Sequence, residues 1–171
     1  MNDQAKRDAM IQAVKDALMV EIKGQQLYSH AAETAKDPEV KAMFQVLAND
    51  EENHVKMLQA QFKPLMEEGR ITLEGFHPAE LDHGSASIIP DSFKKKVKGG
   101  EFEMAVIGIG CQLEVQAIAH YKSKAKNIDD PDLKQLFSWL SDWEEDHLNQ
   151  LRELETMYQD AYWADQGFSP M

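Results

Sequence analysis

Several residue types that would define other protein classes are scarce in this chain of 171 residues. It has one cysteine, which excludes an internal disulfide and any metal site made only of cysteines from one chain. The longest clean apolar run, Met104 to Cys111, is too short for a bilayer, which takes about 18 residues or more. The first ten residues lack the apolar core of a signal peptide. We therefore expect a cytoplasmic protein that does not bind membranes.

Positive charge is also in short supply. The chain has 18 Lys and Arg against 30 Asp and Glu, which gives a formal net charge of −12. Nucleic-acid backbones and anionic lipid surfaces both select clustered cations, so this balance argues against either as a partner.

Sequence patterns typical of β-strands are absent as well. The length suffices for one domain with a sizeable core, and we predict a single domain over residues 1–171.

The sequence repeats itself at an offset of 93 residues. Residues 20–58 lie over 113–151 without a gap, with 12 identities in 39 positions. Average amino-acid usage would give about 2 or 3 identities by chance. A duplicated unit is therefore indicated. The identical pairs include Glu21/Glu114, Tyr28/Tyr121, Glu51/Glu144 and His54/His147.

Each unit is predicted to be a helical hairpin. Apolar residues recur every three or four positions, which is the spacing of one helix face. The pairs Asp37-Pro38 and Asp130-Pro131 end one helix and start the next, because Pro suits a first helical turn. The units cover about residues 3–69 and 101–163.

The segment between the units, residues 70–100, contains several Gly and Pro and is predicted to be mostly loop, with a short helix near 92–98. It is long enough to return along a whole bundle, which would make the second and third helices parallel. This is the ferritin-like connection. The predicted fold is therefore all-α: an internally duplicated, ferritin-like four-helix bundle with a long crossover between the second and third helices.

Six ionisable residues fall on the helix faces that the period assigns to the core. Burying one unpaired carboxylate costs several kcal/mol, and four close together also repel one another. No Lys or Arg on these faces offers a partner. Two divalent cations would balance four carboxylates. The residues are Glu21, Glu51, His54, Glu114, Glu144 and His147.

The spacing of these six residues also fits metal binding. Glu-x-x-His places a carboxylate and an imidazole one turn apart on the same helix face. The motif occurs at Glu51 and at Glu144, each with a further Glu 30 residues upstream. Two such helices plus two helices with one Glu each form a carboxylate-bridged dimetal set. The alternatives are buried ion pairs or solvent-facing side chains.

These motifs resemble the rubrerythrin and ferritin-like di-iron superfamily, and in particular stand-alone rubrerythrin-type domains. The resemblance covers about residues 3–163. It implies that Glu51 and Glu144 bridge two iron ions and act as the catalytic ligands. It also implies that Glu21, His54, Glu114 and His147 bind one metal each. Carboxylate and imidazole ligands favour iron, with manganese or zinc as substitutes.

The chain departs from rubrerythrins proper in two ways. Where they have a further ligand Glu in the third helix, this sequence has Ala117. They also contain a rubredoxin module with paired cysteines, whereas Cys111 is alone here. The resemblance therefore implies an electron donor that is a separate protein.

Three functions follow from this pattern, and whether the chain is an enzyme stays open. The first is a peroxidase-like oxidoreductase that reacts with peroxide or O2 and takes electrons from an external donor, as a homodimer. The second is a ferroxidase or iron-storage protein, which needs a closed shell of subunits. The third is a scaffold protein with a redox-silent metal.

Residues next to the ligands have two interpretations each. Tyr28 and Tyr121 either hydrogen-bond a ligand from a facing helix or are core aromatics. Gly24 and Ala117 either leave room for a small oxidant or allow close helix packing. Asp50 precedes a ligand Glu and is interpreted as a surface acid rather than as a group that orients an imidazole.

Overall fold

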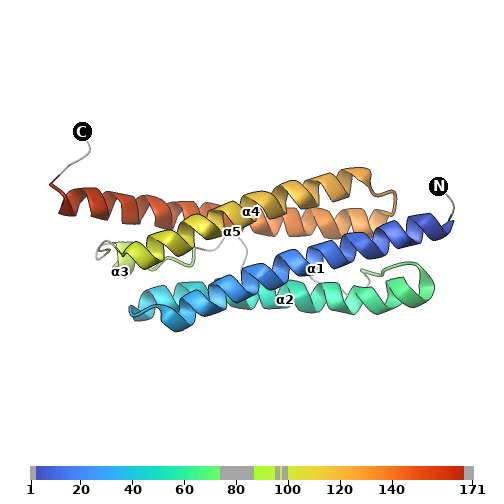
Figure 1. The fold of residues 1–171 in the computed structure, drawn as a ribbon, viewed down its shortest axis with the longest axis horizontal. Coiled ribbons are helices and arrows are strands. Elements are labelled where there is room, and N and C mark those ends of the chain that lie inside the picture. Colours follow the sequence, from blue (N-terminus) through green and yellow to red (C-terminus); the bar gives the residue numbers. More distant parts are fainter. Residues whose placement is uncertain (1–2, 74–86, 95–96, 98–99, 168–171) are drawn as a thin grey trace.

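The computed structural model describes residues 3–73, 87–94, 97 and 100–167, and its regular elements in these ranges are all helices. The elements are α1 (Asp3–Thr34), α2 (Pro38–Glu68), α3 (Asp91–Lys94), α4 (Glu101–Asn127) and α5 (Pro131–Asp165). The prediction of an all-α ferritin-like bundle is confirmed. Helices α1 and α2 form one hairpin and α4 and α5 the other, and α1 also contacts α4 (Figure 1).

The two hairpins begin their second helices in the same way. The Asp37 side chain accepts hydrogen bonds from the backbone N–H groups of Glu39 and Val40, at 2.7 and 3.2 Å. The Asp130 side chain accepts one from the backbone N–H of Leu133 at 2.9 Å. Each Asp is followed by a Pro in the first turn, where the missing N–H costs nothing. The Asp-Pro pairs therefore fix where α2 and α5 begin, and with that the position of each Glu-x-x-His motif along its helix.

The ends of the crossover are fixed to the bundle by two buried glutamines. Gln61 of α2 accepts a hydrogen bond from the backbone N–H of Thr72, and Gln150 of α5 accepts one from Ile88, each at 3.1 Å. Helices α2 and α4 run in the same direction, as a long crossover requires (Figure 1). Much of the predicted crossover, at 74–86, 95–96 and 98–99, lies outside the described residues. The short helix predicted at 92–98 is found at Asp91–Lys94.

Two apolar clusters fill the bundle, and each takes residues from all four long helices. One cluster contains Tyr28, Phe44, Ile107 and Leu151. The other contains Val14, Leu58, Tyr121 and Phe137. The buried charged residues lie between them. The buried charged residues therefore form a polar layer at the middle of the bundle, surrounded by the four long helices.

Helix α4 is the one described helix that is long and apolar enough to cross a membrane by length and composition, with a mean hydropathy of 1.3. This is weak support for a membrane span, because a core helix passes the same test. The helix carries buried Glu114, and its outer face exposes Phe102, Ile109 and Val115. The expectation that the chain does not bind membranes stays a prediction.

Replacing Asp130 by Ala should destabilise the protein by about 1 kcal/mol, because the first turn of α5 loses its capping acceptor. Urea unfolding followed by circular dichroism would measure the change. The matched control is Asp129→Ala, since Asp129 is exposed and its 4.0 Å contact with Lys6 contributes little. Equal losses in the two variants would contradict a capping role for Asp130.

Candidate metal centre

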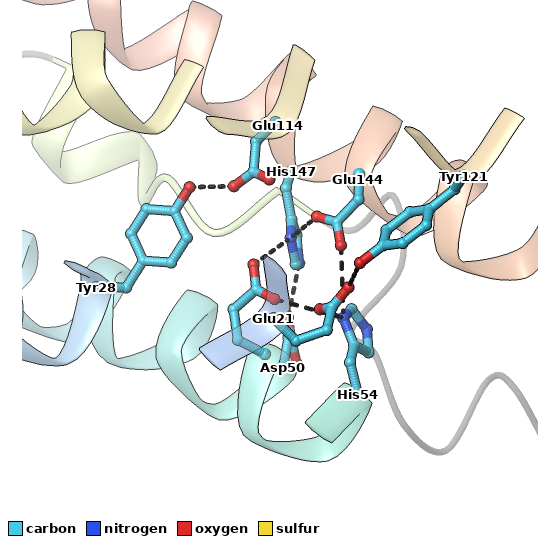
Figure 2. A network of polar contacts seen from close by, with 9 residues as sticks. Glu21, Tyr28, Asp50, His54, Glu114, Tyr121, Glu144 and His147 are labelled. Atoms are coloured by element: carbon cyan, nitrogen blue, oxygen red, sulfur yellow. Dashed lines mark hydrogen bonds and ion pairs between the residues drawn. The ribbon is translucent and has the colours of Figure 1, made fainter. Parts of the chain in front are cut away.

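The six predicted ligands come together in the middle of the bundle. Each of the four long helices contributes: Glu21 from α1, Glu51 and His54 from α2, Glu114 from α4, and Glu144 and His147 from α5 (Figure 2). All six are buried, with at most 3% of any residue exposed. The helical period places each side chain inward, and the matching turns bring the two motifs to the same depth.

The six side chains form two overlapping groups, each with one ligand atom per residue and all of these atoms within 4.8 Å of one another. Two glutamates, Glu51 and Glu144, belong to both groups. The first group adds Glu21 and His54, and the second adds Glu114 and His147. Each group thus has three carboxylates and one imidazole, and the two groups share a pair of carboxylates.

Both imidazoles present Nδ1 to the carboxylates. Nδ1 of His54 lies 3.0 Å from Glu21 Oε2 and 3.6 Å from Glu51 Oε2. Nδ1 of His147 lies 3.2 Å from Glu144 Oε2 and 3.4 Å from Glu51 Oε1. A neutral imidazole can offer the lone pair of this nitrogen to a metal.

The two tyrosines connect the repeats in a reciprocal way. The Tyr28 hydroxyl donates a hydrogen bond to Glu114 Oε1, and the Tyr121 hydroxyl donates one to Glu21 Oε1 (Figure 2). Each tyrosine therefore holds the upstream glutamate of the other repeat. One oxygen of each of these carboxylates is occupied, which fixes the orientation of the other. Burial and the neighbouring carboxylates raise the pKa of both phenols well above the usual value, so they remain donors.

The carboxylates interact unfavourably when only protein surrounds them. Burial, followed by the charge of Glu21, raises the pKa of Glu51 to about 8. Burial and the charge of Glu51 raise the pKa of Glu144 well above its usual range, and burial likewise raises that of Glu114. For Glu21, burial also disfavours the charge, but the hydrogen bond and charge of His54 prevail and lower its pKa to about 2.

This donor set fits a pair of divalent cations. Among the described residues, no Lys or Arg is buried, so the protein itself supplies no fixed positive charge at this depth. Four carboxylates and two imidazoles match the ligands of carboxylate-bridged di-iron sites. Cys111 is half-buried against one apolar cluster and belongs to neither ligand group.

The interpretation of Asp50 as a surface acid is wrong. Only 5% of this residue is exposed, and its Oδ2 lies 3.5 Å from Nε2 of His147. The side chain at the equivalent position of the second repeat, Trp143, stacks on the ring of His54. The 93-residue offset could have revealed the pairing of these two positions, but not the histidine that each one meets.

A pocket of about 200 Å³ reaches the carboxylates from between α1 and α4. Its walls combine ligands, the two small residues at equivalent positions of the repeats, and polar residues nearer the surface: Val20, Lys23, Gly24, Glu51, Leu113, Glu114, Gln116, Ala117, His120 and Glu144. A Cβ atom at Gly24 would lie 3.0 Å from the Glu51 carboxylate. The absence of a side chain at Gly24 therefore lets Glu51 take its place beside the pocket.

Comparison with known proteins agrees with this geometry. The family model described as rubrerythrin matches residues 12–155, which is most of the chain and includes all six candidate ligands. No curated protein and no solved structure gives a significant match.

The metal-free protein should lose stability as the pH rises from 5 to 8, by a few kcal/mol. Glu51 and Glu144 have raised pKa values in the folded state, so their favourable contribution is complete below about pH 4.5. The contribution of Glu51 is lost as the pH rises through its pKa of about 8, and that of Glu144 is also lost as the pH rises. The raised pKa of His147, which burial opposes but the nearby carboxylates of Asp50, Glu144 and Glu51 produce, acts in the same direction. The lowered pKa of Glu21 matters only below its usual value of 4.5.

Thermal unfolding of chelator-treated protein at several pH values measures this slope. Glu51→Gln should flatten it, whereas Glu52→Gln, at the exposed neighbouring position, should leave it unchanged. Bound metal replaces protons on the carboxylates, so loaded protein should melt higher with a weaker pH dependence. If the unfolding temperature of the metal-free protein rose between pH 5 and pH 8, repulsion among the buried carboxylates would not be what limits its stability.

Proposed function

The chain belongs to the rubrerythrin family, and we propose on this basis that it is a di-iron oxidoreductase that reduces hydrogen peroxide or O2 with electrons from a separate donor. The observation that carries the proposal is the sharing of Glu51 and Glu144 between two buried ligand groups. A pair of shared carboxylates is what a site for two adjacent metals needs.

In this proposal Glu51 and Glu144 would hold both metals, because they belong to both ligand groups. Glu21 and His54 complete one position, and Glu114 and His147 the other. When bound, two iron ions supply one electron each, which matches the two-electron reduction of peroxide to water. The family and the ligand set support iron, and the donor set also accommodates manganese or zinc.

The chain's own residues prepare the site in three ways. Tyr28 and Tyr121 fix the outer glutamates, so these carboxylates need not reorganise when they bind. The two apolar clusters exclude bulk water from both ends of the polar layer. The pocket beside Gly24 and Ala117 has room for a molecule the size of peroxide or O2, which supports a small oxidant as the substrate.

Replacing Glu144 by Ala should abolish the reaction of iron-loaded protein with peroxide, because it removes a carboxylate shared by both ligand groups. Stopped-flow absorption of anaerobically loaded protein, mixed with hydrogen peroxide, reports the oxidation of iron. Glu145→Ala is the matched control, since Glu145 pairs with Lys122 and belongs to neither ligand group. Cys111→Ser should also react normally.

The outcome separates the proposed function from the alternatives. A redox-silent scaffold would show no iron oxidation in the parent protein. A storage protein would oxidise many iron ions per chain and have the native mass of a closed shell. The proposed oxidoreductase should oxidise two iron ions per chain and stop until a reductant is added. Light scattering and the stoichiometry of oxidation distinguish these results.

Ala117→Leu should slow the oxidation by peroxide by on the order of tenfold or more, because the larger side chain fills the pocket beside the carboxylates. Val115→Leu, on the exposed outer face of the same helix, is the control. Metal stoichiometry should stay at two per chain in both variants. An unchanged rate in Ala117→Leu, with metal binding intact, would show that the oxidant arrives by another path.

A further inference from the structure

The outer face of α4 is apolar although no other part of the described chain covers it. The most apolar stretch of this helix has a mean hydropathy of 1.3, yet only 28% of that stretch is buried. Phe102, Ile109 and Val115 are 37%, 51% and 47% exposed. Contiguous apolar surface of this kind is typical of an interaction site.

The middle of this face also lacks charge. Between Met104 and Ala119 the one charged residue is Glu114, which is buried among the candidate ligands. A groove of about 440 Å³ between α4 and α5 extends the face sideways. Half of the residues that line the groove are apolar: Val115, Ile118, Ala119 and Leu148.

Exposed charges stand at the two ends of the face, and their signs differ. Glu101 lies in the first turn of α4. Lys122 and Lys126 lie near the end of the helix, four residues apart and therefore on one side of it. The face thus has an acidic end, an uncharged middle and a basic end.

We propose that this face of α4 is the interface of a homodimer, in which the α4 helices of two copies pack antiparallel about a two-fold axis. The axis passes near the middle of the helix, so the first turn of each α4 lies beside the last turns of the other. Glu101 of each copy then lies next to Lys122 and Lys126 of the second copy. A two-fold axis makes every contact twice, so both ends of the face are paired with opposite charge.

The distribution of charge is what selects a second copy as the occupant. Two chains that each have a formal net charge of −12 repel one another, so they associate only through a surface without exposed acids at its centre. The middle of the α4 face meets this condition. Parallel packing would place Glu101 against Glu101, whereas antiparallel packing places it against lysines. An anionic membrane would repel the chain as a whole.

The interface borders the candidate metal centre but does not supply ligands to it. Glu114 is on the buried side of α4, and all six candidate ligands come from one chain. Gln116 lines both the pocket that reaches the carboxylates and the groove beside Cys111. A variant that dissociates the dimer should therefore still bind two metals per chain, which provides a check that it is folded.

Sedimentation equilibrium tests the interface. The parent protein should have twice the chain mass of 19.4 kDa at micromolar concentration. Ile109→Glu should give the mass of a single chain, because it places a charge in the uncharged part of the contact. Met66→Glu is the matched control, since it adds the same charge to an exposed apolar residue of α2 and should stay dimeric. A monomeric parent, or equal dissociation in both variants, would overturn the proposal.

A charge exchange tests the antiparallel arrangement. Glu101→Lys and Lys126→Glu should each raise the dissociation constant by about tenfold, since each reverses a contact that occurs twice. The double variant should regain most of the parent affinity, because the pair is restored with its signs exchanged. If the charges serve only the ends of α4, the double variant will dimerise no better than the single ones, and the arrangement is wrong.

The inference does not depend on the proposed function, and the two fail in different ways. A monomer that binds two metals and oxidises iron would overturn the interface and leave the oxidoreductase standing. A monomer that floats with phosphatidylcholine vesicles would overturn it in favour of a lipid surface. A dimer that dissociates with Ile109→Glu but does not oxidise iron would support the interface and contradict the proposed reaction.

Discussion

The structure depends on one electrostatic constraint, which is that four carboxylates lie in the middle of a helical bundle with no buried Lys or Arg among the described residues. Taking such charges out of water is costly, and their mutual repulsion adds to the cost. Protons can relieve this, as the raised pKa of Glu51 indicates, but only by giving up the charges. Two divalent cations relieve it while keeping every carboxylate ionised. The apolar clusters on either side matter for the same reason, because they keep out the water that would otherwise screen the charges.

The internal duplication turns this constraint into a definite geometry. Each repeat supplies one upstream glutamate and one Glu-x-x-His motif, so neither repeat forms a complete site for two metals alone. The repeats are also connected through the ligands themselves, because Tyr28 holds Glu114 and Tyr121 holds Glu21. Assembly of the two hairpins and assembly of the ligand set are therefore the same event. The polar layer lies at mid-length, with an apolar cluster from all four long helices on each side.

Most of the fold and the six-residue cluster could be predicted from the sequence, because both follow from helical period and turn chemistry. The Asp-Pro turns fix where α2 and α5 begin, and the 30-residue separation from each upstream glutamate then sets a common depth. Contacts between helices from different repeats were harder to predict. Whether Asp50 meets solvent or His147 depends on the rotation of α2 relative to α5, which local spacing does not determine. The pocket beside Gly24 has the same origin, since it depends on how α1 and α4 approach each other.

Asp50 and Trp143 occupy equivalent positions of the two repeats, and here the repeats differ without the loss of a ligand. A change at Glu51 or Glu144 would alter both ligand groups, because both groups use these carboxylates. A change one residue earlier leaves all six ligands in place and alters only the surroundings of one histidine. The two occupants differ in kind, since a carboxylate polarises the imidazole that it contacts and an indole restrains it by stacking. The two repeats therefore differ in what surrounds each histidine, while the shared carboxylates belong to both ligand groups.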